Sequence, residues 1–411
     1  MEYVFYFDES FHDRKITISD GGIFNITREN SLDNYIGVFW GCKQKSLHTN
    51  IRLIEEFESK QRLLFQLVDD FEIKSTLINK KNFKFGINSF NDKALRFYFD
   101  FFSLISEIKP IIQITAISKM EYYLRCLLKN IEFPSQYVIS NQNFYYTMTK
   151  LFIFYHNNEL NKTLFDSEGE KNITEDTLIQ SINTVLEAIK DIPRKRREYL
   201  AFENLAQLIN DSELNISPSQ KIDFRYYPNF DGLTLLLNEL SIKQSRIKLT
   251  IDEEDSTFNE AKSFSFGKLN QADSKNAIQL HLSDILSGFL GRMMYAISND
   301  ASMKEDHINE ITDVFKNDLT TKRILSPSWF ELDKNQFELY QLIYNALVIN
   351  NQHHWSLLTL SYSDQILSLF ELFKYIGSFP TYDSFKNITV DAHSENHNSW
   401  CCSIIDEAFE K

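Results

Sequence analysis

Three short strand-like runs precede the first helix-like segment of this chain, and that order narrows the folds it can adopt. The runs are rich in aromatic and β-branched residues, the types that favour strands, and Gly21-Gly22 is a turn signal between the first two. They cover residues 4–7, 22–26 and 35–40. Three leading strands with no helix between them predict an antiparallel meander at the start of a sheet.

Strand-like and helix-like segments alternate after the meander. Apolar residues at helical spacing predict helices over residues 50–68, 89–108, 120–129, 144–159, 175–189, 195–210, 233–245 and 277–298. Further strands are predicted over residues 71–73, 111–117, 222–226, 246–251 and 263–266. We expect residues 300–372 to be helical and the segment after Pro380 to be polar and irregular.

Three leading strands followed by alternating strands and helices make up the RNase H-like layout, with which a helical insertion is compatible. We therefore expect an α/β fold with an RNase H-like mixed sheet, whose core is divided between residues 1–117 and 216–298. Residues 118–215 form the expected helical insertion, and residues 299–411 a C-terminal helical region with an irregular tail. The local patterns alone support only an α/β fold with helical additions.

Composition limits the classes of function. The chain has 411 residues, of which 43% are hydrophobic, and this excludes wholesale disorder. Proteins that bind nucleic acid without sequence preference usually carry a net positive charge, whereas this chain has a formal net charge of -14. A local basic patch on the surface is still compatible with that charge. The four cysteines are not a disulfide framework, and no run is apolar enough to span a membrane. The first residues lack the features of a signal peptide, so we expect a cytoplasmic protein.

Three aspartates stand where a carboxylate is well placed for metal chemistry. Asp8 closes the first strand, Asp252 closes a late strand, and Asp284 lies within a long helix. Strand-end carboxylates converge where neighbouring strands end together, and a crossing helix can add another. Two divalent ions about 4 Å apart need several such oxygens to catalyse phosphodiester hydrolysis.

Each aspartate also has a simpler interpretation. Asp8 can be a turn former, and residues 252–255 can be a solvated acidic loop. Asp284 is surrounded by apolar residues on its helix, so its charge needs a metal ion or a Lys or Arg partner. His281 and Gly288 share its helix face, and Gly288 leaves room for the close approach of a strand or a ligand.

The segment Tyr6-Phe7-Asp8-Glu9-Ser10 resembles the Tyr-x-Asp-Glu-Ser opening of a large, mostly bacterial family, domain-of-unknown-function family 3800. Its members have an RNase H-like fold and carry a Ser-Lys pair followed by a Gln-Leu-Ala-Asp helix motif. Here Ser274-Lys275 precedes His281-Leu282-Ser283-Asp284, and the serine and the aspartate are 284 minus 274, or ten, positions apart. His281 and Ser283 depart from the Gln and Ala of the family pattern.

Two further segments match the family in the same order along the chain. Its Glu-x-Lys motif resembles Glu72-Ile73-Lys74, and its acidic strand resembles Leu249-Thr250-Ile251-Asp252-Glu253. The matches lie between about residues 3 and 295, and residues 118–215 and those after 300 lie outside them. Activity is poorly established across the family, so the resemblance implies a nuclease-like site.

The resemblance implies roles for the matched residues. Asp8, Asp252 and Asp284 are expected to hold metal and act in catalysis, with Glu72 as the fourth acid. Further metal-ligand candidates are Glu9, Glu253 and His281. Substrate contacts are expected from Lys74, Ser274 and Lys275. For Lys275 the alternative is a solvated lysine at a helix entry.

Two other clusters of residues could bind a ligand. The basic run Arg194-Lys195-Arg196-Arg197 either contacts a phosphate backbone through Arg194, Arg196 and Arg197 or is a solvated helix end. The tail gathers His393, His397, Cys401 and Cys402, but their spacing is not that of a zinc finger. We interpret His353-His354-Trp355 as packing and surface residues.

The favoured hypothesis is a Mg²⁺- or Mn²⁺-dependent nuclease that acts on DNA or RNA. Proteins of this type often serve in defence against mobile elements or as toxins. The rival is a non-catalytic interaction or regulatory module, with the aromatic segment 96–102 as a partner surface. A separation above about 10 Å between Asp8, Asp252 and Asp284 would exclude a shared metal cluster. A phosphotransferase is disfavoured because no phosphate-cradling glycine loop appears.

The expected partner is nucleic acid, and no membrane contact is expected. A protein partner at the helical insertion or the C-terminal helices, and a homo-oligomer, stay open.

Overall fold

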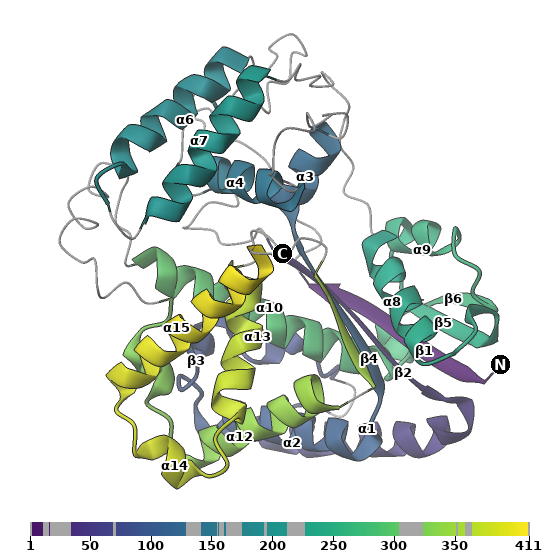
Figure 1. Cartoon of the computed structure of the whole chain (residues 1–411). Helices are drawn as coiled ribbons and strands as arrows, with labels where there is room; N and C mark the ends of the chain where they lie inside the picture. Colours follow the sequence, from purple (N-terminus) through teal and green to yellow (C-terminus); the bar gives the residue numbers. More distant parts are fainter. Residues whose placement is uncertain are drawn as a thin grey trace.

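A six-stranded mixed sheet lies at the centre of the protein (Figure 1). The computed structural model describes residues 2–10, 16, 34–68, 71–128, 141–153, 155, 160–161, 175–192, 195–211, 227–303, 324–350, 352–357 and 364–409. In spatial order the strands are β6 (Lys268–Ala272), β5 (Ile247–Asp252), β1 (Tyr3–Ser10), β2 (Asn34–Lys43), β4 (Ile111–Ser118) and β7 (His353–Leu357). β2 is antiparallel to β1 and β4, whereas the pairs β1–β5, β5–β6 and β4–β7 are parallel.

Both faces of the sheet are buried, which explains the nearly continuous apolar run of its central strands. Successive side chains of a strand point to opposite faces. Val4 and Tyr6 of β1 belong to the larger hydrophobic core, and Phe5 and Phe7 belong to a second core on the opposite face. Asp8 therefore follows the Val4 and Tyr6 side of the strand.

Helices cover the two faces unequally. The larger core receives side chains from α1 (Leu47–Phe65), α2 (Asp92–Ile108), α10 (Leu280–Met303), α12 (Lys334–Tyr344) and α13 (Asp364–Gly377). The second core is covered mainly by α8 (Tyr227–Glu239), with α9 (Asp255–Ala261) beside it. The short strand β3 (Lys84–Ile87) precedes α2 and lies outside the sheet.

The aromatic helix α2 is part of the core. Phe97, Tyr98, Phe101 and Phe102 are all fully buried. These four side chains are therefore unavailable as the partner surface that the interaction-module hypothesis assigned to residues 96–102, and of the aromatic residues there only Phe99 is partly exposed.

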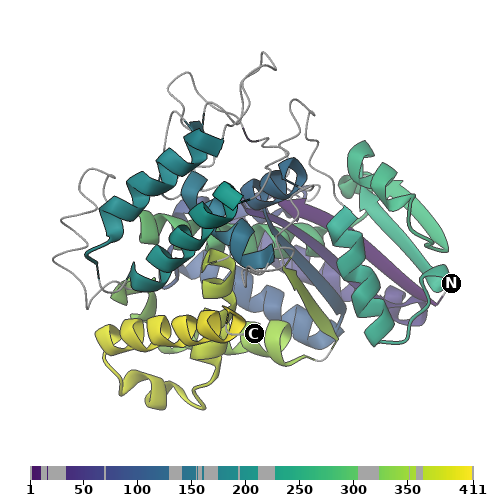
Figure 2. The ribbon, with the colours of Figure 1, turned by 45° about the horizontal axis from the view of Figure 1, so that its top comes forward.

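Residues between β4 and α8 include a group of helices with a core of their own. It is formed by α3 (Lys119–Leu127), α4 (Asn141–Ile153), α6 (Glu175–Ile189) and α7 (Arg196–Asp211). α6 and α7 pack against each other and α3 packs against α4 (Figure 2). Since α3 starts where β4 ends, the group begins at the sheet edge where β1 and β5 also end.

The C-terminal region joins the larger core. α12 packs on α2, α13 packs on α10, and α15 (Val390–Phe409) packs on α13. α14 (Tyr382–Lys386) contacts α12 and contributes Phe385 to the same core. In the described part of the chain, no helix combines the length and apolar character needed to cross a membrane.

Several sequence predictions about strands were wrong. Residues 71–73 form no strand, because Phe71 lies in a turn that closes on the carbonyl of Val68. Residues 263–266 are a turn after α9, and β6 begins at Lys268. Residues predicted as helix include the edge strand β7. The predictions for residues 22–26 and 222–226 lie outside the described residues. Among the strands that the structure describes, β1, β2 and β4 form the antiparallel set.

Two helix predictions need correction. The helix predicted over residues 233–245 spans Tyr227–Glu239, because Ser241 adopts a left-handed conformation that ends it. The tail after Pro380 is helical, whereas the sequence predicted it to be irregular. Although its sequence is mostly polar, one side of helix α15 is buried. His393, His397 and Cys401 are spaced four residues apart and face the core.

Candidate metal centre

Asp8 and Asp252 lie side by side near the carboxyl ends of two parallel strands. The sequence placed Asp8 at the end of its strand, but β1 continues to Ser10, whereas β5 does end at Asp252. Phe7 of β1 pairs with Ile251 of β5, so the next residue of each strand is an aspartate. Neighbouring strands are about 4.8 Å apart. Ile251 faces the second core, so Asp252 points to the face that carries Tyr6 and Asp8. The two carboxylates therefore share one face and one edge of the sheet.

Asp284 reaches the same place from α10, which crosses β1. Ser283 Oγ donates to the Tyr6 carbonyl at 3.2 Å, and Ser287 Oγ lies 3.1 Å from Ser10 Oγ. Asp284 lies between these two contacts, opposite Asp8. Burial and the charges of Asp284 and Asp252 raise the pKa of Asp8 well above its usual value. The three aspartates therefore lie near one another, and Asp8 is repelled by the charges of the other two.

Backbone and hydroxyl donors orient these carboxylates. The Ser75 N–H donates to Asp284 Oδ2 at 2.6 Å, and Ser75 Oγ donates to Asp284 Oδ1 at 3.0 Å. The Glu9 N–H donates to Asp8 Oδ1 at 2.8 Å, and the Ser274 N–H donates to Asp252 Oδ1 at 3.2 Å. Each carboxylate oxygen has a second lone pair, so these bonds leave acceptor capacity for a cation.

Gly288 allows the loop that carries Ser75 to approach α10. A Cβ atom at Gly288 would overlap Ser75 Cβ and Oγ, so only glycine fits this contact. The sequence predicted a close approach here but not its partner. Arg292, one turn further along α10, places its Nη2 atom 3.5 Å from Ser75 Oγ. Burial raises the pKa of Asp284, and the Ser75 bonds and the charges of Arg292 and Lys74 oppose that rise.

Glu72 and Lys74 lie on the loop just before Ser75. Lys74 Nζ is 3.1 Å from Glu72 Oε2, and Glu72 Oε1 is 3.4 Å from His281 Nε2. The charge of Lys74 acts on Asp8 and Asp284 as well as on Glu72. Lys74 therefore stands among the acids.

His281 is bonded to groups other than Asp8, Asp252 and Asp284. Its Nδ1 hydrogen-bonds the buried Glu58 of α1, and its Nε2 lies 2.9 Å from the Ser274 carbonyl. Burial opposes protonation, but Glu58, Ser274 and Glu72 outweigh it and raise the pKa of His281. Both ring nitrogens face acceptors, so His281 lacks the lone pair that a metal ligand needs. The expectation that His281 binds metal is corrected on this ground.

Glu9 and Glu253 each follow one of the aspartates in the sequence, but their side chains have other surroundings. Glu9 alternates with Asp8 and so faces the second core, where burial and Glu254 raise its pKa well above the usual range. Glu253 follows the end of β5 and is exposed. Glu9 therefore lies on the opposite face of the sheet from Asp8, and the expectation that it binds metal is corrected; Glu253 stays a candidate, with its N–H donating to Asp252 Oδ1 at 2.9 Å.

The residues proposed to contact substrate differ in their exposure to solvent. Lys275 is exposed, and Ser274 acts through its backbone, which binds both Asp252 and His281. Arg194 lies outside the described residues, while Arg196 and Arg197 are exposed at the start of α7. Lys195 of the same run is buried against Tyr155 and Glu198.

The tail cluster is not assembled for zinc. His393 bonds the Tyr375 hydroxyl and the Phe385 carbonyl, and Cys401 Sγ lies 3.5 Å from His397 Nε2 inside the core. Cys402 is exposed and faces away from that stripe. Burial lowers the pKa of His397 to about 4, which suits a neutral core histidine.

Within the described residues, no three His, Cys, Asp or Glu side chains form a ready-made metal-binding group. Asp8 and Asp252 accept backbone N–H donors, and Asp284 accepts both the N–H and the hydroxyl of Ser75. Carboxylate oxygens are the ligands that Mg²⁺ and Mn²⁺ prefer. The chemistry of the donor set therefore suits such an ion, although the three carboxylates do not form a binding group in this arrangement.

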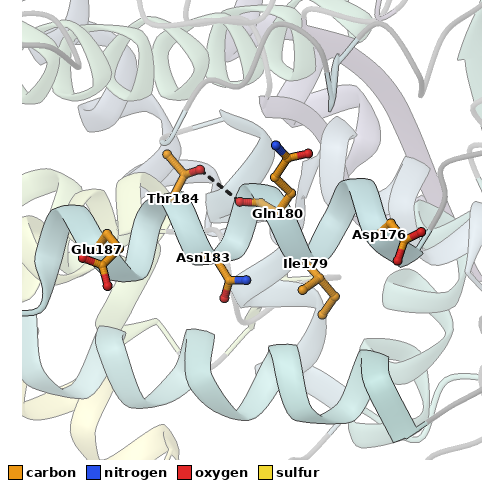
Figure 3. Close-up of a pocket in the computed structure, with 6 residues that line it drawn as sticks. All are labelled: Asp176, Ile179, Gln180, Asn183, Thr184 and Glu187. Carbon is orange, nitrogen blue, oxygen red and sulfur yellow. Dashed lines mark hydrogen bonds between the residues drawn. The ribbon is translucent and has the colours of Figure 1, made fainter.

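A shallow groove lies elsewhere, along α6 of the helical group (Figure 3). It is lined by Asp176, Ile179, Gln180, Asn183, Thr184 and Glu187. Thr184 Oγ1 donates to the Gln180 carbonyl at 3.0 Å within the helix. None of these residues belongs to β1, β5 or α10, so the groove is separate from the carboxylates.

Comparisons of the chain with models of known protein families, with curated proteins and with solved structures found no match. The function of the protein must therefore be inferred from the site and not from a relative.

Proposed function

We propose that this protein is a Mg²⁺- or Mn²⁺-dependent nuclease that hydrolyses phosphodiester bonds in nucleic acid. The observation that carries the proposal is the convergence of Asp8, Asp252 and Asp284 from two strands and one helix at one sheet edge. Carboxylates whose charges repel one another are stabilised by a bound cation. No arrangement of this kind is needed for the fold alone, because neutral side chains would pack there without repulsion.

The sheet supports an RNase H-like core. β1, β2 and β4 are an antiparallel set, and β5 and β6 add in parallel on the free side of β1. The segments that resemble domain-of-unknown-function family 3800 also meet in space, although they are far apart in the chain. Their residues Asp8, Glu72, Asp252, Ser274 and Asp284 are linked through shared contacts around α10.

The residues divide into three tasks in this proposal. Asp8, Asp252 and Asp284 would hold the cation, with Glu72 beside them. A bound divalent ion lowers the pKa of water and stabilises charge on phosphate oxygens. Ser75 orients Asp284 through two hydrogen bonds. Exposed Lys275, Arg196 and Arg197 are the proposed contacts to the phosphate backbone.

The test is cleavage of labelled single- and double-stranded DNA and RNA with Mg²⁺, Mn²⁺ or EDTA. We expect cleavage that requires metal and that falls at least a hundredfold in Asp284→Asn. Asp176→Asn, a matched change at an exposed position on α6, is the control and is expected to cleave normally. Equal cleavage by both variants, or cleavage in EDTA, would refute the proposal.

A further inference from the structure

We propose that residues 74–84 form a basic surface that binds the phosphate backbone of nucleic acid beside the carboxylates. This inference rests on the proposed function and deepens it, because it gives the substrate a path from Asp284 along α10. Of the lysines on this surface, the sequence pointed only to Lys74.

The segment is distinguished by its charge. It carries Lys74, Lys80, Lys81 and Lys84 and no Asp or Glu, in a chain whose formal net charge is -14. Contacts from lysine and arginine to phosphates supply most of the sequence-independent affinity of a protein for nucleic acid. An acidic protein that binds nucleic acid therefore needs a local group of cations, and this segment provides one.

The segment packs along α10 and begins at the carboxylates. At one end Ser75 donates two hydrogen bonds to Asp284, and further along Lys80 Nζ lies over the Tyr295 ring. Asp284 and Tyr295 are 295 minus 284, or eleven, residues apart, which is about 16 Å of helix. The lysines thus follow the part of α10 that leads away from the proposed catalytic site.

The backbone of the segment is held in place. Ile78 and Phe83 are buried in the larger core, and the Asn79 side chain accepts the Lys81 N–H at 3.0 Å. The apolar residues point inward and leave Lys81 and Lys84 exposed. A surface that is ordered before binding loses less conformational freedom when a ligand binds to it.

The ammonium groups of Lys81 and Lys84 are available to a ligand. In the part of the chain that the structure describes, neither of them forms an ion pair with an acid. Lys74, in contrast, lies 3.1 Å from Glu72. A phosphate can therefore bind Lys81 and Lys84 without breaking an existing ion pair, so these two lysines carry the test.

Lysines that only keep the surface solvated would behave differently. Their removal would leave the salt dependence of nucleic-acid binding unchanged, because no counterions are released from phosphates at those positions. The salt dependence of binding therefore separates the two roles, and it does so without reference to cleavage.

The experiment is fluorescence anisotropy of labelled single- and double-stranded oligonucleotides, titrated with the full-length chain in EDTA at several salt concentrations. EDTA prevents metal-dependent cleavage, so binding is measured alone. We expect Lys81→Gln/Lys84→Gln to weaken binding of every sequence. The slope of log affinity against log salt should fall by about 2, one for each lost phosphate contact.

The matched control is Lys43→Gln/Lys45→Gln, which removes the same charge from two exposed lysines. Lys43 pairs with Tyr3, at the opposite end of β1 from Asp8, so this control should bind like the wild type. Thermal unfolding followed by circular dichroism confirms that each variant is folded.

Three outcomes would overturn the basic surface. They are an unchanged slope in the folded Lys81→Gln/Lys84→Gln variant, an equal fall in the control, and displacement of the oligonucleotide by polyglutamate as effectively as by unlabelled nucleic acid. None of them touches the nuclease proposal, which stands or falls with metal-dependent cleavage by the wild type. A slope that falls as expected, in a protein that cleaves nothing, would support the surface and refute the nuclease.

Discussion

Asp8 carries a carboxyl group that its surroundings push toward the neutral form. Burial, Asp284 and Asp252 raise its pKa well above the usual value. A carboxyl whose pKa is higher in the folded state contributes stability while it is protonated, and that contribution is lost as the pH rises through the folded pKa. The metal-free protein should therefore lose stability as the pH rises from the usual aspartate range through the raised pKa of Asp8, until a divalent ion offsets the repulsion.

Asp8→Asn tests this directly. The amide removes the charge but keeps the shape, so we expect the metal-free variant to be more stable than the wild type at neutral pH by on the order of 1 kcal/mol. The wild type should gain stability from Mg²⁺, whereas the variant should not. Calorimetric melting in EDTA and in Mg²⁺ gives both values. A variant less stable than the wild type in EDTA would contradict the proposed repulsion.

His281 links helix α1 to the loop that precedes α10. It joins Glu58 of α1, which is only 1% exposed, to the Ser274 carbonyl. His281→Ala leaves a buried carboxylate with Arg62 as its remaining partner, at 2.6 Å. We expect a loss of about 3 kcal/mol in unfolding free energy, measured in urea. His281→Gln keeps one donor and should lose less; equal losses would argue against the hydrogen-bond role.

The sequence identified the acidic residues of the site but not the side chains that hydrogen-bond to them. Asp8 and Asp252 were identifiable because each follows a run of apolar strand residues, although β1 continues to Ser10, and Asp284 because its helix is otherwise apolar. Ser75 meets Asp284 across 209 positions of sequence, and Glu58 meets His281 across 223. No local pattern carries such contacts, so both partners were missed.

Among the elements, α10 does most to assemble the site. It packs on β1 and β2, and it contacts the turn that carries Ser75. Its apolar periodicity made it predictable, although it begins at Leu280 and not at residue 277. The shift of β6 to Lys268 was not predictable, because Phe264 and Phe266 look like strand residues but cover the second core from a turn.

Gly288→Ala probes the contact between α10 and the Ser75 loop. The added Cβ would overlap Ser75, so we expect the loop to shift and destabilise the fold by roughly 2 kcal/mol. Mn²⁺ affinity should fall as well, because Asp284 loses both donors. The control is Leu235→Ala on α8, which changes an exposed side chain. Gly377→Ala would not serve, because its added Cβ would overlap Tyr344. Unchanged Mn²⁺ affinity in a folded Gly288→Ala would contradict the orienting role of Ser75.

The whole molecule consists of a sheet with two covered faces and a separate helical core at the edge where the acids lie. The layers were predictable because apolar periodicity reports burial. The strand order was not derivable from local sequence, because the parallel pairing of β1 with β5 joins residues more than 240 positions apart. The C-terminal helices proved to extend the larger core, which no motif indicated.

Substrate binding by the helical group should depend on its exposed arginines. We expect the double variant Arg196→Ala/Arg197→Ala to bind nucleic acid more weakly, and the slope of log affinity against log salt to fall by about 2. Arg52→Ala, an exposed arginine on α1 paired with Glu56, is the control. Fluorescence anisotropy at several salt concentrations measures the slope. An unchanged slope would place the nucleic acid elsewhere.

Anomalous diffraction from crystals soaked in Mn²⁺ would locate the ion. We expect an anomalous peak within coordination distance of carboxylate oxygens from Asp8, Asp252 and Asp284. Mn²⁺ bound elsewhere on the protein, with these three carboxylates bonded only to Glu9, Ser274 and Ser75, would contradict the proposed metal site.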